Sequence, residues 1–129
     1  MGEHDAQSKP AVLALDHVQV AMPGGQEDRA RAFYRDILGM LEIAKPAALA
    51  ARGGCWFSSG SAQVHVGVET DFRPAQKAHP ALVVSDLDTI LESCEAAGLP
   101  MKPDDAIDGR RRVHVTDFFG NRIELIAAG

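Results

Sequence analysis

The chain has 129 residues and a formal net charge of −5, with 46% hydrophobic and 24% charged residues. This length suits one domain with one shared core, and the composition excludes a disordered chain or a disulfide scaffold. The acidic balance disfavours nucleic acid or an anionic membrane as a partner. The two cysteines form no CxxC pair, and no stretch has the length of a membrane span or a secretory h-region, so a cytoplasmic location is expected.

The first half of the chain predicts a strand, a helix and a hairpin. LALDHVQVAM, residues 13–22, alternates like a half-buried strand. QEDRARAFYRDIL, residues 26–38, has the apolar spacing of an amphipathic helix, and Gly39 is a typical helix stop. CWFSSGSAQVHVGVE, residues 55–69, then predicts two strands around a Ser-Gly turn.

The second half predicts the same order of elements. HPALVV, residues 79–84, indicates a strand that starts at His79 or lies at a sheet edge, because Pro80 removes a ladder donor. DLDTILESCEAAG, residues 86–98, indicates a capped amphipathic helix. RRRVHVTD and NRIELIA, within residues 110–127, indicate a closing hairpin.

Five landmarks recur at offsets of 58 to 62 residues, which predicts a duplicated unit. The pairs are His17 and His79, Gly39 and Gly98, Trp56 and His114, Gly60 and Gly120, and His65 and Glu124. We therefore expect a flexible tail over residues 1–11 and a single domain over 12–129, with module 1 at about 12–70 and module 2 at about 78–128.

Strand alternation assigns the side chains to two faces, because neighbouring Cβ atoms along a strand point to opposite sides. Aliphatic side chains are expected to pack against the helices: Val18, Val20, Val64, Val66, Leu82, Val84, Val113, Val115, Ile123 and Leu125. The opposite face then carries the polar set: His17, Gln19, Gln63, His65, His79, Arg112, His114, Thr116, Arg122 and Glu124, with Trp56 beside them.

Four of the five histidines fall on this polar face. A solvated sheet face would also be polar, but it would more often carry Lys, Glu and Thr. Histidine is the commonest metal ligand and the usual acid or base near neutral pH. The pattern therefore favours a metal or ligand cleft over a plain solvated face.

The duplicated unit, with LDHVQVAM, KAHPALVV and a terminal FGNRIEL, resembles the vicinal oxygen chelate superfamily of glyoxalases, extradiol dioxygenases, fosfomycin-resistance transferases and bleomycin-resistance proteins. The resemblance covers residues 13–127. It implies an α+β fold in which two tandem βαβββ modules form a curved mixed sheet around a metal or ligand cleft. It also implies a homodimer.

In metal-dependent members a ligand lies on the first and last strand of each module, and these positions here are His17, His65, His79 and Glu124. Two histidines and a carboxylate form a facial site for a divalent ion such as Fe, Mn, Zn, Ni or Co, so His17, His79 and Glu124 are preferred. His65 stands where the family often has Glu or Gln, so it is a fourth ligand or an acid/base group beside the catalytic Glu124.

Substrate contacts are expected from Arg112, His114, Trp56 and Gln63 on the same face. The planar guanidinium of Arg112 suits a carboxylate or a phosphate. Trp56 would supply an aromatic wall or pack in the core.

The resemblance implies a metal-dependent glyoxalase-like enzyme, a lyase or isomerase that forms a metal-stabilised enediolate from a small oxygen-rich substrate. An extradiol-type dioxygenase and a fosfomycin-type thiol transferase are alternative reaction classes. A non-catalytic drug- or metabolite-binding protein of the bleomycin-resistance type is the alternative outside catalysis. The expected partners are a small molecule and a second copy, with no nucleic acid and no membrane.

Overall fold

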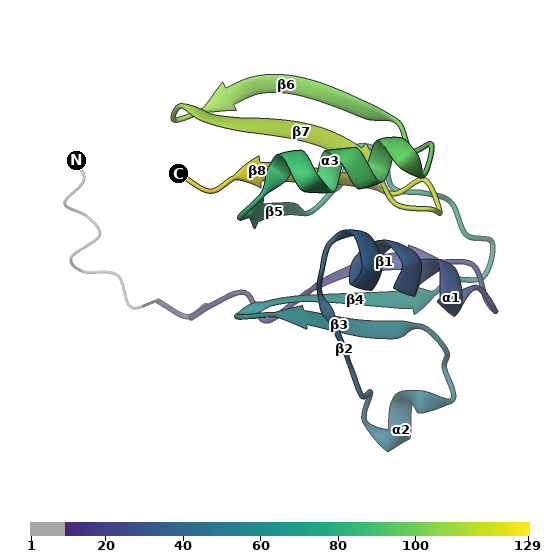
Figure 1. Ribbon diagram of the computed structural model, residues 1–129. Helices are drawn as coiled ribbons and strands as arrows, with labels where there is room; N and C mark the ends of the chain where they lie inside the picture. The colour runs from purple at the N-terminus through teal and green to yellow at the C-terminus, as the bar shows by residue number, and fades with distance from the viewer. Residues whose placement is uncertain (1–9) are drawn as a thin grey trace.

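The computed structural model describes residues 10–129, so most of the predicted tail at 1–11 lies outside the described residues. Within residues 10–129, eight strands form two four-stranded sheets with strand orders β1-β4-β3-β2 and β5-β8-β7-β6. Each half of the chain builds one mixed sheet (Figure 1), which confirms the predicted α+β fold of two tandem modules.

The elements follow the same order in both halves. The first half contains β1 (Val18–Met22), α1 (Glu27–Ala30), the π-helical segment η2 (Arg31–Ile37), β2 (Leu41–Ile43), α2 (Ala47–Ala50), β3 (Cys55–Ser59) and β4 (Ala62–Val68). The second contains β5 (Ala81–Val84), α3 (Leu87–Ala96), β6 (Met101–Ile107), β7 (Arg110–Thr116) and β8 (Arg122–Ala127). Helices α1 and α3 lie on the same side of the two sheets, and α3 contacts η2 (Figure 1). No helix within residues 10–129 is long and apolar enough to cross a membrane.

The sequence pattern does not predict two of the strands, β2 and β6. Strand β2 has only three residues. Strand β6 reads MKPDDAI, is exposed along its whole length and lies at the edge of its sheet. Charged residues and proline are typical of edge strands, which must not pair with other chains, but the same residues hide the strand from an alternation pattern.

The starts of the first strands also differ from the prediction. Strand β1 begins at Val18, so His17 precedes it, and β5 begins at Ala81, after His79 and Pro80. Strand β5 does lie at a sheet edge, as Pro80 indicates. Both histidines are therefore in the approach to a strand and not within the ladder.

The predicted helix over residues 26–38 divides into α1 and η2. One hydrogen bond at its end has π spacing: Leu38 N donates to Phe33 O, five residues back, at 2.9 Å. Met40 N then donates to Tyr34 O at 3.0 Å and closes the end of the segment. Phe33 and Tyr34 are both fully buried. This segment thus places two consecutive aromatic side chains in the core.

Strand register confirms the duplication residue by residue. In the first sheet His65 lies opposite Trp56 on β3 and Gln19 on β1. In the second sheet Glu124 lies opposite His114 on β7 and Ala81 on β5. His65 and Glu124 are therefore equivalent positions, as are Trp56 and His114.

One core serves both modules. It contains the buried aliphatic side chains of both sheets, as the alternation predicts, together with aromatic residues of η2 and β3: Val20, Val64, Val66, Val113, Val115, Ile123, Leu125, Phe33, Tyr34 and Phe57. Leu82 and Val84 are partly buried and pack against this core, whereas Val18, also predicted on this face, is only partly buried and is not among the residues that pack against it. With the aliphatic face committed to the core, the opposite faces of both sheets are left for polar side chains.

A buried polar network joins the two modules at the turn between β7 and β8. The Tyr34 hydroxyl donates to Asp117 Oδ2 at 2.6 Å, and Asn121 Nδ2 donates to the same oxygen at 2.9 Å and to Ala21 O at 2.8 Å. Burial and the adjacent Asp117 carboxylate raise the pKa of Tyr34 well above its usual range, so the hydroxyl stays a donor. The network ties η2 and β1 to the second module.

Replacing Tyr34 with Phe tests this network. The substitution keeps the ring but leaves a buried carboxylate oxygen without its hydroxyl donor, so we expect the free energy of unfolding to fall by about 1–3 kcal/mol. Urea unfolding with an unchanged m value measures this. Ser61→Ala removes a hydroxyl from the exposed β3–β4 turn and should change stability by less than about 0.5 kcal/mol. Equal stabilities of the Tyr34→Phe variant and the wild type would contradict the role of the network.

Candidate metal centre

Three candidate ligands converge on the polar face of the second sheet. His79 precedes β5, His114 lies on β7 and Glu124 lies on β8 between them. One ligand atom of each lies within 4.8 Å of the others, and no other group of His, Cys, Asp and Glu within residues 10–129 has this geometry. Two imidazoles and one carboxylate are a donor set that suits divalent Fe, Mn, Zn, Ni or Co.

The His79 ring is oriented by the chain just before it. Its Nδ1 lies 2.8 Å from Lys77 O, which can only accept, so Nδ1 carries the proton. The opposite nitrogen, Nε2, lies 3.0 Å from Glu124 Oε1. A neutral imidazole would then turn a lone pair toward a carboxylate, an arrangement that requires a positive charge between the two atoms. A second ring proton or a bound metal cation supplies that charge, so the geometry fits a cation site.

Glu124 is buried, with 6% of its surface exposed, yet it is held in its charged form. Burial would raise its pKa, but hydrogen bonds from His79 and from Arg112 Nη1, the latter at 3.2 Å to Oε2, outweigh burial and lower the pKa below its ordinary value. The sheet therefore presents an ionised carboxylate at neutral pH. A carboxylate must be ionised to act as a metal ligand or as a base.

Arg112 directs its donors inward. Besides Glu124, its Nε donates to Asp105 O at 2.6 Å, and its Nη2 lies 3.4 Å from Asp104 Oδ2. Its side chain is 19% exposed. These contacts make Arg112 a support that positions the Glu124 carboxylate, whereas its predicted contact with a substrate stays a prediction.

His114 has both ring nitrogens engaged. Arg122 Nε donates to His114 Nδ1 at 3.2 Å, and His114 Nε2 lies 2.9 Å from Asp104 Oδ2. Arginine only donates, so Nδ1 accepts from Arg122, and Nε2 carries the proton toward Asp104, which is nearer to it at 2.9 Å than Arg122 Nη2 at 3.3 Å. The backbone N–H of Asp105 and then the His114 ring lower the pKa of Asp104. His114 would have to break one of these bonds to ligate a metal.

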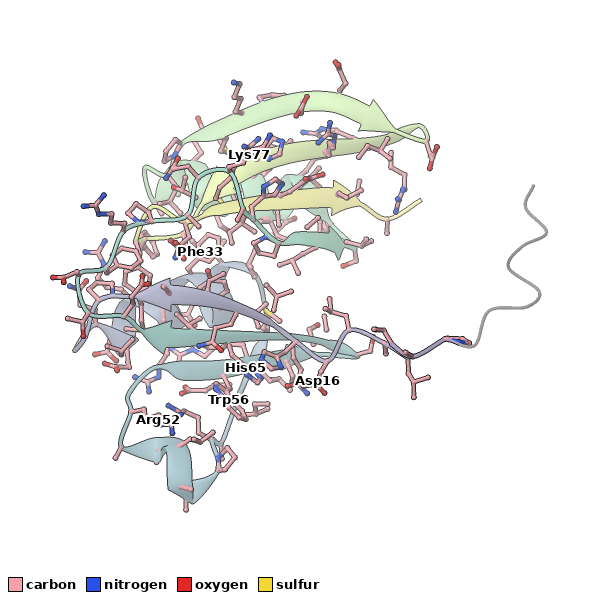
Figure 2. All side chains as sticks on the ribbon, turned by 180° about the vertical axis from the view of Figure 1, so that it is seen from behind. Asp16, Phe33, Arg52, Trp56, His65 and Lys77 are labelled. Carbon is pink, nitrogen blue, oxygen red and sulfur yellow. The ribbon has the colours of Figure 1, made fainter. Side chains whose placement is uncertain are left out.

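The other two predicted ligands lie on the first sheet. The His17 ring stacks on His65 at 3.9 Å between centroids, and His65 stacks on Trp56 at 3.8 Å. His65 Nε2 lies 3.1 Å from Gln63 Oε1. Burial, aided by the neighbouring His17, lowers the pKa of His65, which favours a neutral ring. Figure 2 shows His65 and Trp56 on the sheet away from Lys77, which lies beside the second sheet.

The four predicted ligands are thus divided between two half-sites. His17 and His65 form the first half-site with Trp56, and His79 and Glu124 form the second with His114. The strand register makes the halves equivalent, so the division follows from the duplication. Within residues 10–129, the preferred trio of His17, His79 and Glu124 is not assembled in a single chain.

Sequence reasoning missed several residues that shape the site. Asp104 lies on β6, a strand that the pattern hid, although the PDD sequence is a visible acidic signal. Asp117 and Asn121 bracket the FFG turn that the sequence did predict, but their burial depends on Tyr34 from the other module. Lys77 and Lys102 lie beside the site because of strand pairing and the path of a loop.

A family model described as the Glyoxalase/Bleomycin resistance protein/Dioxygenase superfamily matches residues 14–125. A glyoxalase family protein from Bacillus anthracis is 43% identical, with a TM-score of 0.86, and the match covers 95% of this chain and 100% of that one. A search of curated proteins finds no match to this chain.

Two further solved structures share the fold at lower identity. A variant of the fosfomycin resistance protein FosX from Listeria monocytogenes, complexed with Mn(II) and 1S,2S-dihydroxypropylphosphonic acid, is 19% identical, with a TM-score of 0.72 over 92% of each chain. The oxidase ChaP-H2 is 22% identical, with a TM-score of 0.68 over 91% of this chain and 94% of that one.

The neighbours Arg112 and Arg111 give a matched test of how Glu124 is held. Arg112→Met should lower the free energy of unfolding of the chelator-treated protein by about 1–3 kcal/mol, because it removes a charge-assisted donor from a buried carboxylate. Arg111→Met breaks only an exposed ion pair with Asp88 and should cost about 0.5 kcal/mol or less. Chemical denaturation of both variants measures the difference, and equal effects would show that Arg112 does not hold Glu124.

Proposed function

This chain belongs to the glyoxalase/bleomycin resistance protein/dioxygenase superfamily, and from that premise we propose that it is a metal-dependent enzyme of the glyoxalase type. Its reaction is that of a lyase or isomerase on a small oxygen-rich substrate. The observation that carries the proposal is the convergence of two imidazoles on one ionised carboxylate: His79 Nε2 lies 3.0 Å from Glu124 Oε1, and His114 belongs to the same cluster, a donor set that suits a divalent cation. The likeness in fold to a FosX variant that holds Mn(II) makes Mn(II) the first ion to test.

The chain supplies ligands and a base for this chemistry. A bound divalent ion would act as a Lewis acid that polarises the substrate oxygens and stabilises negative charge on them. Glu124, kept ionised by His79 and Arg112, binds the ion or accepts a proton from the substrate. His65, whose lowered pKa favours the neutral ring, is the second proton acceptor or the fourth ligand.

We further propose that a second copy completes the site. The segment before β1 carries three aliphatic residues that are largely exposed, Val12, Leu13 and Leu15, with Leu13 at 89%. This segment extends away from both sheets (Figure 1) and leads directly into His17. Burying these side chains against another chain is favourable, and it would move His17 and the first half-site toward the second half-site of that chain. The homodimer would then hold the ion through His79 and Glu124 of one copy and His17 of the other.

Metal binding by ligand variants tests this assignment. His79→Ala and Glu124→Gln should weaken Mn(II) binding by more than about 100-fold, because loss of a direct ligand costs more than loss of a supporting group. His17→Ala should have a similar effect if a second copy supplies the ligand, whereas His114→Ala should be the damaging change if one chain holds the ion alone. Calorimetry on chelator-treated, reloaded protein measures the affinities. A wild-type protein that binds no divalent ion would overturn the proposal.

Mixing two inactive variants tests the shared site. His17→Ala and His79→Ala each impair both sites of a homodimer, but a mixed dimer contains one site with neither substitution. Random exchange in an equal mixture makes half of the dimers mixed, so we expect metal binding to return at about one quarter of the sites, with light scattering to confirm the dimer. Restoration should fail if the same two substitutions are carried on every chain. No restoration on mixing, together with a monomeric wild type, would contradict a shared site.

Alternative reaction classes are separated by their products. An extradiol-type dioxygenase is favoured by the two-histidine and carboxylate donor set and would consume oxygen with Fe(II) and a catechol. A fosfomycin-type thiol transferase would form a thiol adduct, and a lyase or isomerase would do neither. A non-catalytic drug- or metabolite-binding protein would keep its ligand affinity in the Glu124→Gln variant, whereas an enzyme would lose turnover.

A further inference from the structure

Positive charge gathers beside the candidate metal centre although the chain as a whole is acidic. The formal net charge is −5. Around Glu124, however, the polar side of the second sheet brings four cationic side chains into a small area, against the two carboxylates of Glu124 and Asp104. The cations are Lys77, Lys102, Arg112 and Arg122. A local excess of positive charge in an acidic protein indicates a site for an anion.

An open cavity lies among these cations. It has a volume of about 470 Å³, which suits a small molecule, and it is lined by Lys77, Lys102, Arg122, His114, Gln76 and Thr116, among others. Register explains the lining, because Lys102 lies opposite His114, and Thr116 lies opposite Arg122. His114 belongs to both the cavity and the ligand cluster, so the cavity opens directly beside the metal centre.

The cations of the cavity are not neutralised by the protein. Lys77, Lys102 and Arg122 form no ion pair with any carboxylate of residues 10–129, whereas Arg112 is paired with Glu124 and Asp104. The contacts of Arg122 are with the neutral Gln76 O and with the His114 ring. Lys77 and Lys102 are exposed (Figure 2 labels Lys77 on the loop beside the sheet), so each has donors directed to solvent or to a ligand.

We propose that this cavity binds the oxyanion group, a phosphate, phosphonate or carboxylate, of the substrate that the metal centre acts on. The inference rests on the proposed function, because the cavity adjoins the ligand cluster. Lys77, Lys102 and Arg122 would bind the anion, whereas Arg112 stays hydrogen-bonded to Glu124. Two lysines act as separate point charges, an arrangement that suits the several oxygens of a phosphate group better than the planar edge of a carboxylate. The substrate class is therefore a small oxygen-rich acid held at one end by charge, with its vicinal oxygens toward His79 and Glu124.

Anion binding by the metal-free protein tests the inference. The chelator-treated protein, in its native oligomeric state, is titrated with inorganic phosphate and in parallel with acetate. The chemical shifts of the Lys102 and Thr116 backbone amides are followed by NMR. We expect phosphate to shift these amides and acetate to bind more weakly. The double variant Lys77→Met/Lys102→Met should raise the phosphate dissociation constant about tenfold or more, because it removes two charged donors.

A second double variant controls for net charge. Arg52→Met/Arg111→Met removes the same two charges, but Arg52 lies beside the first sheet and Arg111 pairs with Asp88 next to α3. Its phosphate affinity should stay within about twofold of the wild type, since neither side chain lines the cavity and exposed charges are screened by salt. Equal loss in both variants, or no shift of Lys102 and Thr116 at millimolar phosphate, would overturn the anion site.

Failure of this inference can be told apart from failure of the proposed function. Retained Mn(II) binding without phosphate binding overturns the anion site alone. Phosphate binding that depends on Lys77 and Lys102 without any Mn(II) binding supports the anion site and overturns the metal-dependent function. Acetate binding that equals phosphate binding would contradict the preference for a phosphate group.

Discussion

The buried carboxylate of Asp117 is the constraint on which the rest of the structure depends. It accepts hydrogen bonds from the Tyr34 hydroxyl, from the Asn121 amide side chain and from the backbone N–H groups of Phe119 and Asn121. A buried carboxylate is stable only when its oxygens are satisfied, so the helix of one module and the turn of the other must meet there. That turn sets the register in which His114 lies opposite Glu124.

Hydrogen bonds fix the charged side chains of the candidate metal centre. Glu124 lies where burial alone would neutralise it, and the donors of His79 and Arg112 keep it ionised. His114 is held in turn by Arg122 and Asp104, so the ring is supported on both sides before any ligand arrives. Such fixed surroundings orient the Glu124 carboxylate before binding, whereas His114 would have to exchange one of its hydrogen bonds to become a ligand.

Duplication explains why one chain carries two half-sites and not one complete site. Each module places a histidine before its first strand and an acid or histidine on its last, so two half-sites arise from one pattern. The modules have since diverged: the first stacks His17, His65 and Trp56 as rings, and the second pairs His79 with Glu124. The helices meet in a shared core, and the polar faces of both sheets therefore stay available for a ligand or for another chain.

The sequence by itself determined the duplication, the order of strand, helix and hairpin, and the strand faces on which His65 and Glu124 lie, because these depend on local periodicity and on offsets along one chain. It did not reveal β6, whose exposed MKPDDAI lacks an apolar face, or the link between Tyr34 and Asp117. Tertiary structure alone decided that Arg112 turns to Glu124 and that the predicted ligands separate into two half-sites. Both outcomes depend on how distant strands and modules pack, and no local pattern records that.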